Sequence, residues 1–332
     1  MKVLITGATG FLGPRLCQRM VTEGYQVRIL CRRTFDLTAI EALPLEKALG
    51  DITDAESVRA AVKGCRDVIH AAANASHRPL AREEQMRVNV EGTRHVARAA
   101  HAEEVERFLH ISSVGAIGIP TDPNQPAEEN FAFNVEHTSL TYHISKHRAE
   151  LEVLTEVDRG LDAIIVNPAL ICGATATGYR VPEPMQRALG NWITPYSPGG
   201  QCLVHVEDVL DGILLALRKG QSGNRYILGG SNVSFHDMSS AVRERLHLTR
   251  LLIPIPSLLA ECKAKITNLL RRTLSVNLAP GYDRRFCYQF YSSRKAQREL
   301  GYEPRDFASI TEEFALHVGS SGFRRGVEER GL

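Results

Sequence analysis

A tyrosine and a lysine lie four residues apart in the segment Thr141-Tyr142-His143-Ile144-Ser145-Lys146. On a helix both side chains project from one face, because residues four apart are neighbours on the helix surface. A phenol titrates near a pKa of ~10, which is too high for efficient proton exchange at neutral pH. A fixed ammonium nearby favours the phenolate and lowers that pKa. Tyr142 and Lys146 therefore predict a proton-transferring pair for a carbonyl or alcohol oxygen.

Two serines close the apolar run Phe108-Leu109-His110-Ile111-Ser112-Ser113 further upstream. Ser113 would end a strand and hydrogen-bond the substrate oxygen, which would orient it for proton transfer. Taken alone, a tyrosine with a lysine nearby is usually an ordinary surface or core pair. The serine, together with a glycine motif at the start of the chain, favours the catalytic interpretation.

Three glycines follow the first apolar run with the spacing GxxGxxG, in Gly7-Ala8-Thr9-Gly10-Phe11-Leu12-Gly13. This spacing allows a sharp turn, a close approach of backbone to a pyrophosphate, and packing of helix on strand. The helix that follows would present N–H groups and a partial positive charge to the phosphates. The strand-turn-helix context predicts a dinucleotide site. Lys146 would then hold the nicotinamide ribose, and Tyr142 would donate a proton as hydride reaches the carbonyl carbon.

The end of the second predicted strand indicates which dinucleotide binds. Proteins that bind NAD generally place an acidic residue about 20 residues past the glycines, for the ribose hydroxyls. The segment Leu30-Cys31-Arg32-Arg33 has no carboxylate, and two guanidinium groups suit a 2′-phosphate. We therefore expect NADP(H), with NAD less favoured. In the alternative interpretation, both arginines simply face solvent.

Asp51 and Ile52 follow the third predicted strand and are expected beside the cofactor. Asp51 could accept a hydrogen bond from the adenine amino group. It could equally cap the helix that starts near Asp54, because aspartate is a preferred N-cap residue. The sequence leaves both roles open.

Strand-like and helical segments alternate through the first half of the chain, and strands joined by helical crossovers pair in parallel. We therefore predict an α/β fold with a doubly wound parallel sheet, the Rossmann arrangement, in residues 1–171 with 206–230 returning to it. Residues 172–205 and 231–332 would form a smaller, mostly helical substrate-binding lobe, with 172–204 mostly loop. The predicted strands are 2–6, 26–31, 45–49, 67–71, 107–112, 162–167 and 224–228, and the predicted helices are 11–23, 54–63, 81–101, 139–158, 206–218 and 294–300.

Composition argues against several classes of protein. A net charge of +2 gives no electrostatic basis for binding nucleic acid. No apolar run approaches the ~20 residues of a membrane span, and a strand that begins at Lys2 leaves no room for a cleavable signal. The seven cysteines and 12 histidines are dispersed, so we expect free thiols, a cytoplasmic location and no metal.

An amphipathic stretch runs from Pro256 to Leu270, with Lys263, Lys265, Arg271 and Arg272 nearby. It could lie on a membrane surface or contact a hydrophobic substrate. The simpler interpretation is a helix packed on its own lobe.

With these motifs the chain resembles the extended short-chain dehydrogenase/reductase family along nearly its whole length. Beyond the glycine loop, Ser113, Tyr142 and Lys146, further segments carry the resemblance. They are His70-Ala71-Ala72-Ala73, Asn89-Val90-Glu91-Gly92-Thr93, Asn167-Pro168-Ala169, His205-Val206-Glu207-Asp208-Val209 and Arg294-Lys295-Ala296-Gln297-Arg298-Glu299-Leu300-Gly301-Tyr302.

The resemblance implies further roles. Ala71, Ala72 and Ala73 would pass along the cofactor, and Pro168 and Ala169 would meet the nicotinamide amide through backbone groups. Asn89 and Asp208 would be structural. Helices 81–101 and 139–158 would pair with a second subunit as a four-helix bundle, giving a homodimer.

Within the family, the chain is most similar to the dihydroflavonol-reductase-like branch, which mainly reduces carbonyls with NADPH. Asn167-Pro168-Ala169 and Arg225-Tyr226-Ile227-Leu228-Gly229-Gly230 carry this similarity. Nucleotide-sugar epimerases and dehydratases usually have Arg-x-x-Asn-x-Tyr-Gly after the sixth strand. This chain has Val166-Asn167-Pro168-Ala169-Leu170-Ile171-Cys172-Gly173, without the arginine or the tyrosine.

Three functions remain open from the sequence. The first is an NADP(H)-dependent oxidoreductase that interconverts a carbonyl and an alcohol on a small or mid-sized hydrophobic molecule. The second is a nucleotide-sugar epimerase or dehydratase with tightly bound NAD(P), and the third is a non-catalytic NAD(P)-sensing protein. His77 and Arg78 could bind an anionic substrate group, although solvated loop residues are commoner. The expected substrate walls are Asn74–Pro79, Val114–Ile119, Ala174–Tyr179 and Trp192–Ser197.

Overall fold

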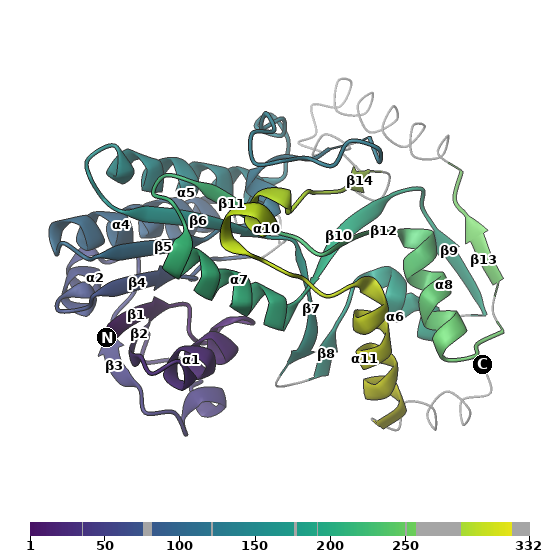
Figure 1. Ribbon diagram of the computed structural model, residues 1–332, viewed down its shortest axis with the longest axis horizontal. Coiled ribbons are helices and arrows are strands. Elements are labelled where there is room, and N and C mark those ends of the chain that lie inside the picture. Colours follow the sequence, from purple (N-terminus) through teal and green to yellow (C-terminus); the bar gives the residue numbers. More distant parts are fainter. Residues whose placement is uncertain are drawn as a thin grey trace.

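The computed structural model (Figure 1) describes residues 1–34, 36–75, 82–120, 122–175, 178–190, 192–249, 251–256 and 287–320. At its centre is a parallel sheet of seven strands in the order β11-β6-β5-β4-β1-β2-β3. The strand order reverses between β1 and β4, which is where doubly wound sheets bind ligands. The predicted fold is confirmed. The strands are β1 (Lys2–Thr6), β2 (Gln26–Cys31), β3 (Glu46–Leu49), β4 (Asp67–His70), β5 (Arg107–Ile111), β6 (Ala163–Pro168) and β11 (Arg225–Leu228).

Helices cover both faces of this sheet. Successive residues of a strand point to opposite faces, so Val3 and Ile5 of β1 pack on one side while Leu4 packs on the other. Burial on both faces explains why inner strands such as β1 and β6 read as continuous apolar runs. One face carries α1 (Gly13–Thr22), α7 (Val206–Lys219) and α10 (Arg294–Leu300), and the other carries α2 (Ala55–Val62), α4 (Gly92–Ala102) and α5 (Thr141–Val157).

The helix predicted over 81–101 is interrupted. After α3 (Arg82–Met86), the chain makes a π-helical turn over Arg87–Glu91 before α4 begins. Asn89 lies in this turn and makes two hydrogen bonds to the backbone of Asn74, at 2.7 and 3.1 Å, and a third to Ser145 Oγ at 2.8 Å. The widened turn therefore ties the end of the β4 segment to α5, in keeping with a structural role for Asn89.

The prediction of loop for 172–204 is wrong, because this region contains short strands and a helix. They are β7 (Leu170–Thr175), β8 (Gly178–Arg180), α6 (Glu183–Gly190), β9 (Ile193–Tyr196) and β10 (Gly200–His205). The glycines and prolines that favoured a loop lie largely at the ends of these elements. Each strand is too short to leave a periodic pattern, and each gains its partners from distant parts of the chain.

A second, smaller sheet organises the rest of this lobe. Its order is β12-β10-β7-β8, with β14 beside β10, while β9 and β13 form a separate pair. The new strands are β12 (Ser231–Ser234), β13 (Leu251–Pro254) and β14 (Tyr288–Gln289), and the helices α8 (Phe235–Arg245) and α11 (Phe307–Ser320) pack here with α6. Residues 257–286, with nearly all of the amphipathic stretch from Pro256 to Leu270, lie outside the described residues.

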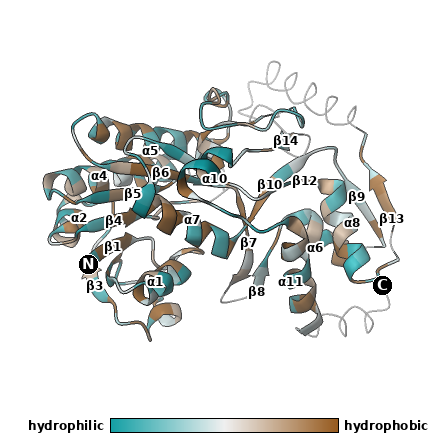
Figure 2. Ribbon diagram, viewed as in Figure 1, coloured by the Kyte–Doolittle hydropathy of each residue, from teal (hydrophilic) through white to brown (hydrophobic). Residues whose placement is uncertain are grey.

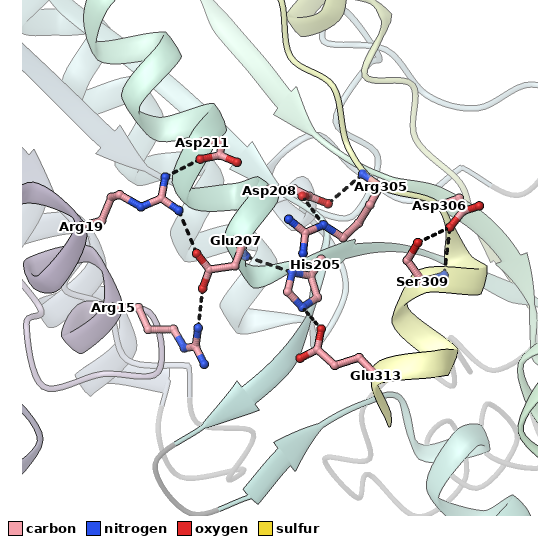
Figure 3. Close-up of polar contacts among 10 residues, drawn as sticks. All are labelled: Arg15, Arg19, His205, Glu207, Asp208, Asp211, Arg305, Asp306, Ser309 and Glu313. Carbon is pink, nitrogen blue, oxygen red and sulfur yellow. Dashed lines mark hydrogen bonds and ion pairs between the residues drawn. The ribbon is translucent and has the colours of Figure 1, made fainter. Parts of the chain in front are cut away.

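Ion pairs and hydrogen bonds gather around the start of α7 (Figure 3). Glu207 pairs with Arg15 and Arg19 of α1, and Arg19 Nη2 lies 2.8 Å from Glu207 Oε2. Asp208 accepts a 3.0 Å hydrogen bond from the backbone N–H of Arg305 and lies 2.8 Å from Arg305 Nε. The carboxylate of Asp208 thus anchors the segment that leads into α11.

Figure 2 shows hydrophobic residues concentrated in the central strands and on β13 at the periphery. Leu251 and Ile253 of β13 are exposed. Within the described ranges, every helix is too short or too polar to traverse a lipid bilayer. Six of the seven cysteines fall in these ranges, and all six are buried free thiols.

Candidate active site

The glycine loop joins β1 to α1 at the reversal point of the large sheet. Gly7 has a φ of +77°, and a Cβ added there would lie 2.6 Å from the backbone nitrogen of Ala72. A Cβ on Gly13, the first residue of α1, would lie 2.3 Å from the carbonyl oxygen of Gly7. Both positions therefore require glycine. Leu12 occupies the N-cap position of α1 and has no polar side chain, so the first N–H groups of the helix can serve an anion.

A cavity of about 390 Å³ opens beside this loop, at the carboxyl ends of the neighbouring strands. Its volume falls in the range of small-molecule sites. The cavity lining includes nine of the predicted cofactor residues, namely Gly7, Thr9, Gly10, Arg32, Asp51, Ile52, Ala71, Ala72 and Ala73. It does not include Phe11, Leu12, Gly13 or Arg33. The cavity is also lined by Asn74 and Ala75, which were expected in a substrate wall, and by residues not predicted at the site, namely Leu30, Gly50, Glu84, Arg87 and Val88.

Charged groups of both signs line this cavity. Arg32 Nη1 lies 3.6 Å from Asp51 Oδ2, and the same carboxylate accepts 2.9 Å hydrogen bonds from the N–H and hydroxyl of Thr53. Burial raises the pKa of Asp51, but the Thr53 bonds and the charges of Arg32 and Arg87 outweigh it and leave that pKa below its usual value. The carboxylate therefore stays ionised and available as an acceptor at neutral pH.

The two alternatives for Asp51 can now be separated, because Asp54 caps α2 by accepting a hydrogen bond from the Glu56 N–H. The interpretation of Asp51 as the cap is wrong.

The two arginines predicted to bind the 2′-phosphate differ in position. Arg32 lines the cavity and Arg33 is exposed outside it, while Arg87 from the π-helical turn contributes a cation that sequence spacing did not reveal.

Ser113 and Tyr142 meet at the carboxyl edge of the sheet. Ser113 follows β5 and caps a single 3₁₀ turn, with its hydroxyl accepting from the Gly115 N–H at 3.1 Å. It also hydrogen-bonds the phenol of Tyr142, the second residue of α5. Burial raises the pKa of Tyr142, against the Ser113 bond and the positive charge of Arg180. Ser113 and Tyr142 therefore lie next to each other. The pKa of Tyr142 is raised, however, whereas the sequence predicted that the nearby lysine would lower it.

Lys146 lies one turn along α5 from Tyr142 and is only 2% exposed. Its ammonium donates a 2.8 Å hydrogen bond to the Ile111 carbonyl and lies 3.4 Å from His110 Nε2. Burial lowers its pKa to about 8, although the charge of Glu150 acts in the opposite direction. Lys146 is thus fixed to the end of β5, and Arg180 is the cation whose charge lowers the pKa of the Tyr142 phenol.

A buried carboxylate supports this end of the site. Glu150 is 1% exposed and lies one turn beyond Lys146 on α5. Its Oε1 accepts a 2.6 Å hydrogen bond from Asn167 Nδ2, and its Oε2 lies 3.2 Å from Arg225 Nη1. Asn167 Nδ2 also donates to the Ser113 carbonyl at 2.9 Å. Glu150 could not be identified from the sequence, because a carboxylate in a helical pattern is ordinarily exposed.

Pro168 ends β6, and the Ala169 N–H that follows donates to the Leu228 carbonyl at 3.0 Å. Both residues lie at the same carboxyl edge as Ser113, although neither lines the cavity beside the glycine loop. His77 and Arg78 lie outside the described residues, as do residues 176 and 177 of the proposed substrate wall.

The family model of the NAD dependent epimerase/dehydratase family matches residues 3–229. A Synechocystis sp. protein provisionally named as a dihydroflavonol 4-reductase is 34% identical, over 90% of this chain and 88% of its own length. Sterol demethylase protein B of Methylococcus capsulatus is 32% identical, over 92% of this chain and 94% of its own. The crystal structure of gox2253 has a TM-score of 0.84 at 32% identity, covering 96% of this chain and 98% of the other.

These matches span most of the chain and include its site-bearing half. The relatives are enzymes of the oxidoreductase and epimerase/dehydratase types, and the family depends on a nicotinamide dinucleotide. The chain belongs to the NAD dependent epimerase/dehydratase family, as an extended short-chain dehydrogenase/reductase with relatives of the dihydroflavonol 4-reductase type.

Proposed function

We propose that the protein is an NADP(H)-dependent oxidoreductase that interconverts a ketone or aldehyde and the corresponding alcohol. The observation that carries this proposal is the hydrogen bond between Ser113 and Tyr142 at the sheet edge, with the Lys146 ammonium buried one helical turn away. A proton donor, an orienting hydroxyl and a cation are groups that assist hydride transfer to a carbonyl.

In the direction of reduction, Ser113 hydrogen-bonds the substrate oxygen and Tyr142 transfers its phenolic proton to that oxygen. The raised pKa of Tyr142 keeps the phenol protonated, so it holds a proton to donate, but it makes the phenol a weaker acid than the sequence predicts. When bound, the nicotinamide supplies the hydride that adds to the carbonyl carbon. In the direction of oxidation, Tyr142 must first lose its proton and then takes the alcohol proton as a phenolate, which its raised pKa disfavours at neutral pH. An ammonium has three donors, and Lys146 directs two at Ile111 and His110, which leaves one for a ribose hydroxyl.

The dinucleotide fits the residues present. The close approach of Gly7, Gly13 and Ala72 leaves bare backbone beside the first turn of α1, where a pyrophosphate is expected. Arg32 and Arg87, both in the cavity lining, support NADP(H) over NAD, because guanidinium groups match a phosphate. Phe11, Leu12 and Arg33 are proposed contacts away from the cavity, and Pro168 and Ala169 are proposed for the nicotinamide amide.

We also propose a cytoplasmic homodimer that pairs through α4 and α5. Leu151 on α5 is 49% exposed, which supports an additional packing partner for that helix, and free thiols are typical of a reducing compartment. The alternative of a nucleotide-sugar epimerase or dehydratase remains a second candidate because the family includes such enzymes.

One experiment separates these functions. Purified protein is passed through gel filtration and then mixed with NADPH and a panel of ketones and aldehydes, and NADPH oxidation is followed by absorbance. We expect cofactor-free protein after filtration and substrate-dependent oxidation of NADPH. Retention of cofactor, with no oxidation across the panel, would instead support an epimerase that makes no net redox change.

A further inference from the structure

We infer that Arg180 is the anion-binding residue of the substrate site, so that the preferred carbonyl substrates carry a carboxylate. This inference rests on the proposed carbonyl reduction and names the class of substrate for it. Arg180 is the last residue of β8 and belongs to the second lobe.

The position of Arg180 links three parts of the site. In the antiparallel pairing of β7 and β8, Arg180 lies opposite Gly173, a few residues after the predicted nicotinamide contacts of the chain. Its guanidinium carbon lies 4.8 Å from the ring centroid of Phe11 in the glycine loop. The positive charge of Arg180 also acts to lower the pKa of the Tyr142 phenol. The guanidinium thus lies over the Phe11 ring in the glycine loop, and its positive charge acts on the Tyr142 phenol.

The charge of Arg180 is available to a ligand. The residue is exposed, and in the described part of the chain no carboxylate forms an ion pair with it. The neighbouring Arg187 on α6 differs, because it pairs with Glu183 at 2.6 Å. A guanidinium placed over an aromatic ring still has N–H groups to offer a ligand, in a planar fork that matches a carboxylate.

A carboxylate of the substrate explains this arrangement better than a phosphate of the cofactor. The first N–H groups of α1 already serve the pyrophosphate in the proposed binding mode, and Arg32 and Arg87 lie in the cavity beside Asp51. Arg180 instead influences Tyr142, which acts on the substrate oxygen. One guanidinium also balances the single negative charge of a carboxylate.

The test compares matched acids and methyl esters of keto and aldehyde compounds, such as 4-acetylbenzoate and methyl 4-acetylbenzoate. The kcat/KM ratio of acid to ester is measured with NADPH for the wild type, Arg180→Gln, Arg180→Lys and the control Arg187→Gln. We expect the wild type and Arg187→Gln to prefer acids. In Arg180→Gln the ratio should fall about tenfold to a hundredfold, the size of a lost charge-assisted hydrogen bond. Arg180→Lys should keep part of the preference.

Binding of the same acids to the NADP-loaded protein, measured by calorimetry, gives a readout that needs no turnover. Oxidation of NADPH by both acids and esters, with a ratio that Arg180→Gln leaves unchanged, would overturn the inference and leave the proposed function standing. So would a rise in the Kd of NADPH in Arg180→Gln without a change in the ratio, because it would assign the guanidinium to the cofactor. Arg180-dependent binding of acids without any turnover would support the anion site and count against the reductase.

Discussion

The two ends of the proposed cofactor site hold their charges in different surroundings. At the adenosine end, the Arg32 and Asp51 side chains are 51% and 36% exposed. At the nicotinamide end, Lys146 and Glu150 are 2% and 1% exposed. Exposed pairs are screened by water and salt and contribute little to stability, whereas a buried charge that loses its partner is strongly destabilising. We therefore expect substitutions at the first end to change selectivity, and those at the second to change chemistry and stability.

The largest effect should come from Tyr142→Phe at the buried end. Phenylalanine keeps the ring and removes the proton donor, so kcat should fall by about 10²- to 10⁴-fold. The Kd of NADPH, measured by fluorescence titration, should stay nearly unchanged. Tyr25→Phe is the control and should keep full activity, because Tyr25 precedes the amino end of β2 and does not line the cavity. Full activity in Tyr142→Phe would reject this residue as the acid.

Glu150→Gln and Glu152→Gln compare a buried and a part-exposed carboxylate on the same helix. Loss of the Glu150 charge leaves Lys146 and Arg225 without their common counter-charge, and the free energy of unfolding should fall by about 3–5 kcal/mol. Glu152 pairs with Arg94 at 2.8 Å near the surface, and its loss should cost at most about 1 kcal/mol. Urea denaturation checks both values. Equal losses in the two variants would contradict the contrast between buried and exposed charges.

At the exposed end, Arg32→Ala should weaken NADPH about tenfold or more while changing NADH little, because a charge-assisted contact to the 2′-phosphate is lost. Arg33→Ala is the matched control and should change both cofactors by less, since Arg33 does not line the cavity. The Kd values of NADPH and NADH are measured for both variants and the wild type at low and at high salt. The effect of Arg32→Ala should shrink as salt increases. Equal weakening of NADPH and NADH would count against a phosphate contact.

The smallest effect is a pH dependence. The pKa of Lys146 is about 8, so its ammonium persists below that pH and is lost as the pH rises through it. The kcat/KM for NADPH should be flat from neutral pH downward and fall about tenfold per pH unit above the pKa. Arginine stays protonated throughout this range, so Lys146→Arg should lack this alkaline decline. An identical decline in that variant would assign the titration to another group.

The large sheet could be predicted from the sequence because most of its strands are buried runs next to a helical pattern, as in Lys2–Thr6 followed by the glycine loop. The edge strand β3 is largely exposed. The pairing of Tyr142 with Lys146 could be predicted too, because residues four apart on one helix are neighbours without any tertiary contact. The strands of the second lobe could not be predicted, because β7 and β10 are short and find their partners far along the chain. Glu150 and Arg180 were missed for a related reason, since burial and proximity to Phe11 arise only from tertiary packing.

The β7–β8 hairpin that carries Arg180 is attached to the smaller sheet and contributes no strand to the larger one. A change in its length would move the guanidinium relative to Tyr142 while the seven parallel strands kept their register. Selectivity could therefore diverge between related proteins through insertions in this hairpin, with the hydride chemistry preserved. For the proposed reductase, we expect changes in the length of this hairpin to alter which carboxylate-bearing substrates are accepted.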